Sequence, residues 1–358
     1  MIVYIFKKIL YTLFVLWGVL SFVFFLFNIL PGDPARMMLD KREDSEQLLI
    51  IQKKYAFDRS VSEQYLLYLN DLLPISLHHN HQESFTSLSN TKYTYFTLVD
   101  LMEYTIVVKI PYLRESFVRT GTKVSTIISQ TFLNTFILAI TSIITALLIG
   151  LIFGILSAIN KDTLFDRMIL IITSLGMSLP SFFASIIIAW LFGFLLHHHT
   201  GLNMTGSLYE VDDYGRGFFL EIKNLILPAF TLAIRPIAVI VQLCRNSLLE
   251  VLSMDYIRTA RSKGLNKISV IFIHALRNAL NPVLTAVSGW FASLLAGAVF
   301  VEYVFAWNGI GKEMVDALNK MDLPVVMGIV LFISVLFVII NIIVDIIYGF
   351  LDPRIRIN

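Results

Sequence analysis

The sequence predicts an all-α polytopic membrane protein with six transmembrane helices, a large extracytoplasmic first loop and a helical cytoplasmic loop. The chain of 358 residues is 56% hydrophobic and 15% charged, which is too apolar for a soluble domain of this length. Its mean hydropathy is +0.74. Hydrophobic runs long enough to cross about 30 Å of hydrocarbon recur along the chain, and a polar and basic run at 245–282 interrupts them.

The first hydrophobic run, at about 9–30, follows Lys7 and Lys8 and predicts a retained anchor rather than a signal peptide. It is too long for a signal-peptide core, and it lacks a small-residue cleavage pattern. Five further runs predict spans at about 131–158, 168–196, 225–243, 282–301 and 324–350.

These runs divide the chain into a first transmembrane helix (1–30), an extracytoplasmic region (31–130) and a five-helix core (131–358) that contains the 245–282 loop. Region 31–130 mixes both charges with aromatic side chains, so we expect it to fold rather than to be disordered. The short loops that hold Lys161 and Arg167, and then residues 258–277, are rich in positive charge. The positive-inside rule therefore predicts that both termini and the 245–282 loop are cytoplasmic.

Glycines and prolines predict how the spans pack. Gly150 and Gly154 form a GxxxG pattern in the second span, which lets two helix backbones approach closely. Pro180 in the third span, and Pro228 and Pro236 in the fourth, should kink or break their helices. Carbonyl groups freed in this way are tolerated inside protein or along a wet cavity. The alternative is a kink that only improves helix packing.

Arg235 is the one charge that falls well inside the fourth predicted span. A charge at that depth costs several kcal/mol unless it faces water, a partner or the interior of the bundle. We interpret Arg235, together with Pro236 and Pro180, as lining a passage. The alternative is that the span begins later and that Arg235 extends to the outer interface.

The 245–282 loop reads as two short helices joined by a hinge. The first is expected from about 247 to 263 with Gly264 as its left-handed cap, and Asn266 is a good N-cap for the second. Tyr256, Ala260 and Gly264 lie four residues apart, so the side chains on one face of the first helix become smaller toward the hinge. Such a face suits insertion into a groove on a partner protein. The alternative is an ordinary re-entry loop with solvated charges.

Five motifs together resemble one family. DYIRTARSKGL (255–265) and HALRNALNP (274–282) resemble the cytoplasmic coupling loop of ABC importer permeases for oligopeptides and dipeptides. LPGDP (30–34), RESFVRTGTKVSTII (114–128) and LDPRIR (351–356) resemble the first, B-type permease subunit of that family. The resemblance spans the chain and implies that Asp255, Tyr256, Arg258, Ala260 and Gly264 couple to an ATPase. Residues 72–109 look like an insert without a family motif.

The resemblance implies a permease subunit of an ATP-driven importer in the bacterial cytoplasmic (inner) membrane. Its expected partners are membrane lipid, a second permease subunit, two ATP-binding subunits and an extracytoplasmic solute-binding protein. The chain has no GxxxxGK[ST] motif, so ATP and Mg²⁺ are expected on the ATPase chains and no cofactor on this one. Di- or oligopeptides are the expected substrate. The alternatives are nickel chelates or glutathione, or a non-transporting membrane scaffold or sensor.

The sequence gives little support to other functional classes, namely nucleic-acid binding, ion-coupled transport, metal binding and enzymatic catalysis. The net charge of +2 is spread over loops, so nucleic acid is not an expected partner. The second and third spans contain no ionisable residue, which disfavours ion-coupled transport. Two histidine groups, at 78–81 and 197–199, lack the spacing of a metal site, and no arrangement of side chains suggests an enzyme active site.

Overall fold

A computed structural model describes residues 2–29, 45–80, 85–89, 92–212, 215 and 217–351. The LPGDP motif, His81 and the residues of the LDPRIR motif beyond Leu351 lie outside these residues. The chain forms two compact units. We call the described residues of 131–313 and 336–351 the helical unit, and the described residues of 2–130 and 314–335 the mixed unit.

The mixed unit combines helices with a small sheet, which the sequence analysis did not predict within the folded region 31–130. Its helices within 2–130 are α1 (Ile2–Ile29), α3 (Ser45–Tyr55) and α4 (Val61–Leu72). The strands are β1 (Ile75–His79), β2 (Tyr95–Asp100) and β3 (Tyr104–Lys109). They form an antiparallel sheet in the order β1-β3-β2, because the β2–β3 hairpin presents its second strand to β1.

A buried polar cluster explains how charged residues fit inside this unit. The Asp71 carboxylate accepts hydrogen bonds from Arg114 Nε and from the Tyr93 hydroxyl, both at 2.8 Å. Lys109 Nζ donates to the Asp71 carbonyl at 2.7 Å and lies over the Tyr93 ring. Burial lowers the pKa of Lys109 to about 8. Because each buried charge has partners, the region folds despite its polar composition.

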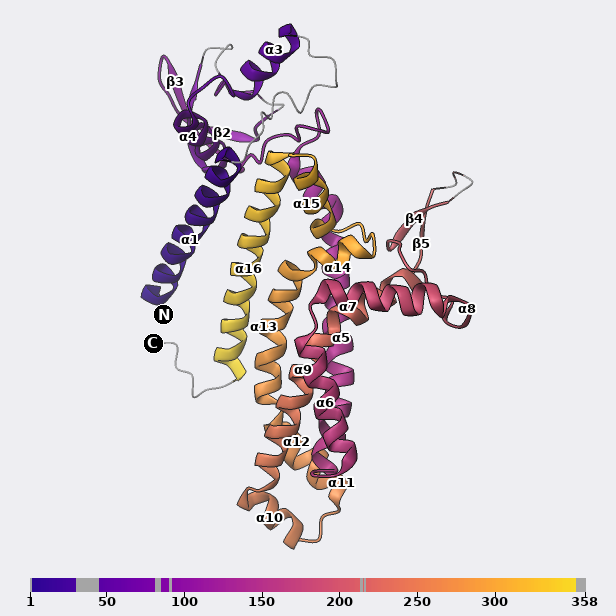
Figure 1. Ribbon diagram of the computed structural model, residues 1–358. Coiled ribbons are helices and arrows are strands. Elements are labelled where there is room, and N and C mark those ends of the chain that lie inside the picture. The colour runs from indigo at the N-terminus through magenta and orange to yellow at the C-terminus, as the bar shows by residue number, and fades with distance from the viewer. Residues whose placement is uncertain are drawn as a thin grey trace. The chain divides into compact units, whose positions relative to one another are not determined.

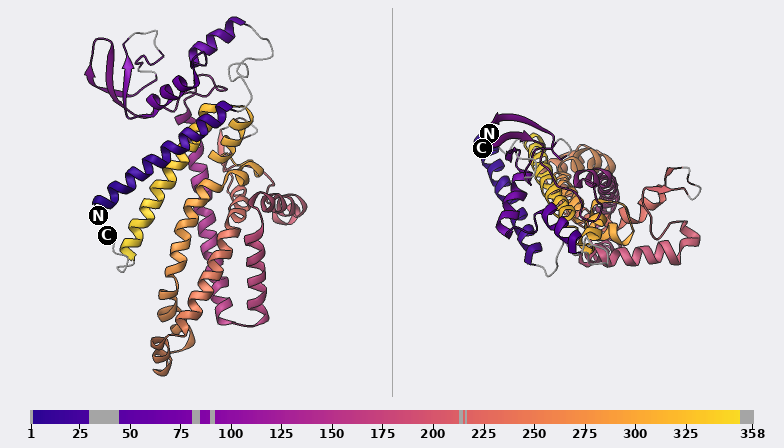
Figure 2. Two further views of the ribbon diagram at one scale, coloured as in Figure 1. Left: turned by 60° about the vertical axis from the view of Figure 1, so that its left-hand side comes forward. Right: turned by 90° about the horizontal axis from the view of Figure 1, so that it is seen from above.

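The remaining elements lie wholly or partly in the helical unit, and three of them, α5, α15 and α16, continue into the mixed unit. They are α5 (Val124–Ile159), α6 (Leu164–Ser178), α7 (Ser181–Ile188), the π-helix η1 (Ala189–Leu195), α8 (His197–Thr200), the hairpin β4 (Tyr209–Val211) and β5 (Phe218–Leu220), α9 (Lys223–Leu252), α10 (Asp255–Ser262), α11 (Lys267–Ser269), the π-helix η2 (Val270–Ala275), α12 (Leu276–Ala279), α13 (Asn281–Gly297), α14 (Val299–Val304), α15 (Ile310–Asn319) and α16 (Leu323–Leu351). Figure 1 shows α6, α9 and α13 running beside α5, with α10 at one end of this bundle. The left view of Figure 2 shows the same side-by-side arrangement.

Four helices are long and apolar enough to cross a membrane, namely α1, α5, α9 and α16. Two bent pairs also pass this test when each is joined, α6 with α7–η1 at 110° and residues 267–279 with 281–295 at 51°. The described residues therefore give four to six spans, and the count of six remains a prediction. The predominantly helical membrane fold is confirmed.

The predicted effects of the prolines separate into two cases. α6 ends at Ser178 and α7 begins after Pro180, so the predicted break in the third span is confirmed. α9 continues through both Pro228 and Pro236, so these prolines do not break the fourth span, and a kink there stays a prediction. Both prolines are buried in α9, where surrounding helices hold the chain in a helical path despite the missing N–H donors.

The GxxxG pattern packs α5 closely against α9. A Cβ added at Gly150 would lie 2.5 Å from a side-chain carbon of Ile240, and one at Gly154 would lie 2.7 Å from the Cβ of Cys244. Contacts this short leave no room for even a methyl group. The predicted close approach of the second span is confirmed, and its partner is the fourth span.

An ion pair fixes the N-terminal end of α6 to α9. Arg245 donates from Nε and Nη2 to the two carboxylate oxygens of Asp166, at 2.7 Å each. Ser157 of α5 also donates to Asp166. Such a bidentate, hydrogen-bonded pair holds three helices in register beside the start of the 245–282 loop.

Candidate functional site

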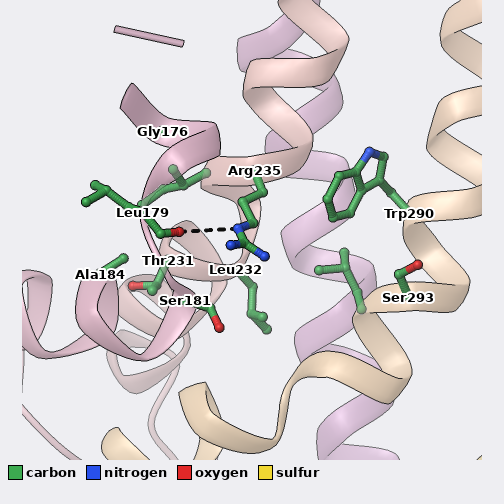
Figure 3. Close-up of a pocket in the computed structure, with 11 residues that line it drawn as sticks. Gly176, Leu179, Ser181, Ala184, Thr231, Leu232, Arg235, Trp290 and Ser293 are labelled. Atoms are coloured by element: carbon green, nitrogen blue, oxygen red, sulfur yellow. Dashed lines mark hydrogen bonds between the residues drawn. The ribbon is translucent and has the colours of Figure 1, made fainter. Parts of the chain in front are cut away.

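A cavity of about 180 Å³ lies within the helical unit, between α6, α7, α9 and α13. Its walls are mostly apolar, with one cation and three hydroxyl groups among them. The lining residues are Gly176, Leu179, Ser181, Ala184, Thr231, Leu232, Ile234, Arg235, Trp290, Ser293 and Leu294. Figure 3 shows the Arg235 side chain between Leu179 on one side and Trp290 on the other.

Arg235 lies in the interior of α9 and not near its start, and its side chain is exposed. Its place in a passage and the alternative of an interfacial arginine both stay predictions. Arg235 follows Lys223, the first residue of α9, by 12 positions (235 − 223), or about 18 Å along the helix. Its Nε donates to the Leu179 carbonyl at 3.3 Å. Leu179 and Pro180 lie between α6 and α7, so the break at Pro180 exposes the Leu179 carbonyl group that Arg235 binds.

The three residues predicted to line the passage are therefore placed differently. Arg235 lines the cavity, whereas Pro180 shapes it indirectly by separating Leu179 from Ser181, both of which line it. Pro236 is buried in α9 and is not a cavity residue. Sequence reasoning did not identify Trp290 or the hydroxyl groups of Ser181, Thr231 and Ser293, because only the packing of distant helices brings them to Arg235.

The 245–282 loop contains the predicted hinge, but its first helix does not begin at the predicted residue. Gly264 has φ = +81°, and the Asn266 side chain accepts a 2.7 Å hydrogen bond from the Ser269 N–H, so both caps are confirmed. The predicted start of the first helix at about 247 is wrong. Residues 247–252 belong to α9, and α10 is a separate helix of Asp255–Ser262.

The face formed by Tyr256, Ala260 and Gly264 is not uniformly available to a partner. Ala260 is only 8% exposed and belongs to a buried cluster with Ile257 and Val270 of the same loop. The Tyr256 hydroxyl accepts a 2.8 Å hydrogen bond from Asn278 Nδ2, which joins the two halves of the loop. The expectation that Ala260 faces a partner groove is therefore wrong, because that methyl group is buried in a cluster that the loop shares with α5 and α9.

Exposed apolar side chains lie beside α10 instead. We call Leu265, Ile268, Phe272 and Ile273 the apolar tip; their exposed fractions are 41, 70, 54 and 65%. Asp255 and Arg258 are also exposed and form an ion pair of 3.3 Å. Where exposed apolar side chains adjoin one another, they are typical of a protein or membrane interaction surface. The signal for it in the sequence was the spacing of apolar residues within an otherwise polar loop.

A second buried site, which sequence reasoning did not identify, closes the other end of the helical unit. The fully buried Glu302 of α14 accepts hydrogen bonds from Thr135 Oγ1 at 2.7 Å and from the N–H groups of Gly311 and Lys312 at 2.7 and 3.2 Å. Trp307 Nε1 donates to the Asn134 carbonyl at 3.1 Å. We call this arrangement the Glu302 cap. Its signal in the sequence was the spacing of Glu302, Trp307 and two glycines.

Two of the described histidines, His78 and His197, have close polar neighbours within the chain. His78 is buried, with Nδ1 2.8 Å from the Thr86 carbonyl and Nε2 2.9 Å from Ser76 Oγ. His197 Nδ1 lies 2.6 Å from the Leu202 carbonyl. Within the described ranges, no three histidine, cysteine or acidic residues are placed to hold a metal ion.

Comparison with known proteins gives matches over most of the chain. Residues 150–357 match the family described as binding-protein-dependent transport system inner membrane component. Residues 1–109 match the family model for the N-terminal part of such membrane components. The latter match includes residues 72–109, so the interpretation of this segment as an insert outside the family is wrong.

Individual relatives match the chain from end to end. A di/tripeptide transport system permease protein of Pseudomonas aeruginosa is 32% identical over 95% of this chain and 94% of its own length. An oligopeptide transport system permease protein of Bacillus subtilis is 33% identical over 99% of this chain and 100% of its own. A solved inward-facing MetNI methionine ABC transporter has a TM-score of 0.49 and 15% identity, covering 64% of this chain and 97% of that one.

Proposed function

Because the chain belongs to the ABC importer permease family of binding-protein-dependent transport systems, we propose that it is the permease subunit of an importer for di- or oligopeptides. It is a multi-pass inner-membrane protein and a transport subunit rather than an enzyme, and ATP hydrolysis belongs to separate subunits. The end-to-end similarity to two peptide permeases carries the proposal of a peptide substrate.

Two ATP-binding subunits, with ATP and Mg²⁺, are the proposed partners of the 245–282 loop. The apolar tip supplies exposed area for docking, and the capped hinge at Gly264 holds α10 in a fixed direction beside it. Within this proposal Asp255 and Arg258 are exposed contacts, whereas Tyr256 and Ala260 keep the loop folded. A well-formed loop of this kind is suited to transmit motion from an ATPase to the helices that follow it.

A second permease subunit is the proposed partner of α13. Thr285, Gly289 and Ser293 recur every four residues along one exposed face of this helix. A Cβ added at Gly289 would meet nothing within 4 Å, so a second helix has room to approach closely there. Ser293 also lines the Arg235 cavity, which would place that cavity along the boundary between the two permeases.

Reconstitution tests this function directly. The chain, its second permease, the ATP-binding subunits and the solute-binding protein are placed in proteoliposomes, and uptake of a labelled tripeptide is measured with ATP. We expect ATP-dependent accumulation that requires the binding protein. Accumulation of a nickel chelate or of glutathione in place of the tripeptide would overturn the peptide assignment, and purification without any ATP-binding subunit would favour a scaffold.

Cysteine labelling tests the proposed orientation, in which both termini and the 245–282 loop are cytoplasmic and residues 31–130 are extracytoplasmic. Cys244 is fully buried, so a Cys244→Ala background removes it with little change in volume. An impermeant thiol reagent added to intact cells should label Ser87→Cys and spare the exposed Ser262→Cys until the cells are opened. The reverse pattern would contradict this orientation.

A further inference from the structure

We propose that Arg235 binds the terminal carboxylate of the peptide during its passage, an inference that rests on the proposed peptide substrate. Arg235 is an exposed cation midway along a candidate membrane-spanning helix, and it lines a cavity whose other described lining residues include no acid. It has no ion-pair partner in the part of the chain that the structure describes. A charge in that position is costly unless something compensates it.

The protein uses only part of the hydrogen-bonding capacity of this guanidinium group. Its Nε donates to the Leu179 carbonyl, which fixes the direction of the side chain. The four N–H groups on Nη1 and Nη2 have no acceptor among the described residues, and a guanidinium offers five N–H donors in a planar fork. A carboxylate is the group that matches such a fork, through two parallel hydrogen bonds. The neutral Leu179 carbonyl orients the cation without neutralising it.

The other walls of the cavity suit the end of a peptide. Figure 3 shows the hydroxyl groups of Ser181 and Ser293 on two sides of the space into which Arg235 points. Trp290 and Leu294 offer apolar surface for a side chain of any kind. A volume of about 180 Å³ corresponds to about six water molecules, which accommodates a terminal residue but not a whole peptide. The site therefore recognises what all unmodified peptides share and ignores their sequence.

A simpler role for Arg235 is to hold α6 and α7 together through Leu179, and the two roles predict different results. A structural role would affect transport of every peptide equally. A carboxylate site would affect only those peptides that carry the carboxylate.

The test compares a tripeptide with a free carboxyl terminus and the same tripeptide as its C-terminal amide. Each is supplied at saturation of the solute-binding protein, and uptake and ATP hydrolysis are measured in proteoliposomes with the full complex. The variants are Arg235→Gln, which removes the charge, and Arg235→Lys, which keeps it. The control is Gln242→Ala, which alters the same helix outside the cavity.

In the wild-type complex we expect uptake of the free-acid peptide to exceed that of the amide by about 10-fold or more, since a hydrogen bond to a charged group is worth about that factor. Arg235→Gln should lower free-acid uptake to the rate of the amide and leave amide uptake unchanged. Arg235→Lys should retain part of the preference for the free-acid peptide over its amide. Gln242→Ala should retain the whole of that preference.

Wild-type free-acid uptake in Arg235→Gln, or an equal loss for both peptides, would overturn the carboxylate site while leaving the peptide importer intact. Equal uptake of the free-acid peptide and its amide by the wild-type complex would also overturn the carboxylate site and leave the peptide importer intact. Failure of the wild-type complex to transport either peptide would overturn the proposed function itself, and the carboxylate site with it.

Discussion

Replacing Ile268 and Phe272 together by aspartate should abolish ATP-dependent uptake and release the ATP-binding subunits during purification. Both side chains belong to the apolar tip and are 70 and 54% exposed, so the chain itself has room for the change. In the proposed complex the same side chains are buried against a partner. Two unpaired carboxylates in such an interface would cost several kcal/mol of docking.

The measurement is the ratio of ATP-binding subunits to permease after affinity purification, together with uptake in proteoliposomes. Ser262→Asp is the matched control, because it adds a carboxylate to the exposed surface of the same loop outside the apolar tip. Normal retention of the ATP-binding subunits in the Ile268→Asp, Phe272→Asp variant would show that the apolar tip faces something else. Ala260→Glu is a poorer test, since its new carboxylate would lie in the buried cluster that the loop shares with α5 and α9.

Gly311→Ala should strongly destabilise the helical unit. A Cβ at this position would lie 2.5 Å from the Cα of Val299 and 2.8 Å from the carboxylate of Glu302. Backbone cannot withdraw as a flexible side chain can, so α14 and α15 would have to separate. That separation would also lengthen the Gly311 hydrogen bond to Glu302 and leave a buried acceptor short of a donor. The combined cost is about 3 kcal/mol or more.

Thermal unfolding in detergent and the yield of monodisperse protein report this loss. Gly18→Ala is the control, since it makes the same substitution inside α1 where nothing lies within 4 Å of the new methyl group. Helix propensity alone makes that control neutral or slightly stabilising. A Gly311→Ala protein that unfolds at the wild-type temperature would mean that the Glu302 cap does not hold this end of the unit.

Several features followed from the sequence because they depend on one residue and its immediate neighbours. Gly264 and Asn266 marked the hinge, since a left-handed cap and an N-cap are properties of the local backbone. Pro180 marked the break between α6 and α7. Gly150 and Gly154 predicted a close helix contact because a missing side chain has that consequence for any partner, although not which partner.

Tertiary structure decided whatever required segments distant in sequence to meet. Pro228 and Pro236 resemble Pro180 locally, yet α9 stays helical because neighbouring helices enclose it. Glu302 gains its donors from Thr135 and Gly311, 167 and 9 residues away, and Arg235 meets a carbonyl group 56 residues away. Burial of Ala260 likewise depends on the second half of the loop folding back onto the first. Local pattern fixes the backbone of single elements, whereas the orientation and pairing of a buried polar group depend on the neighbours that packing brings to it.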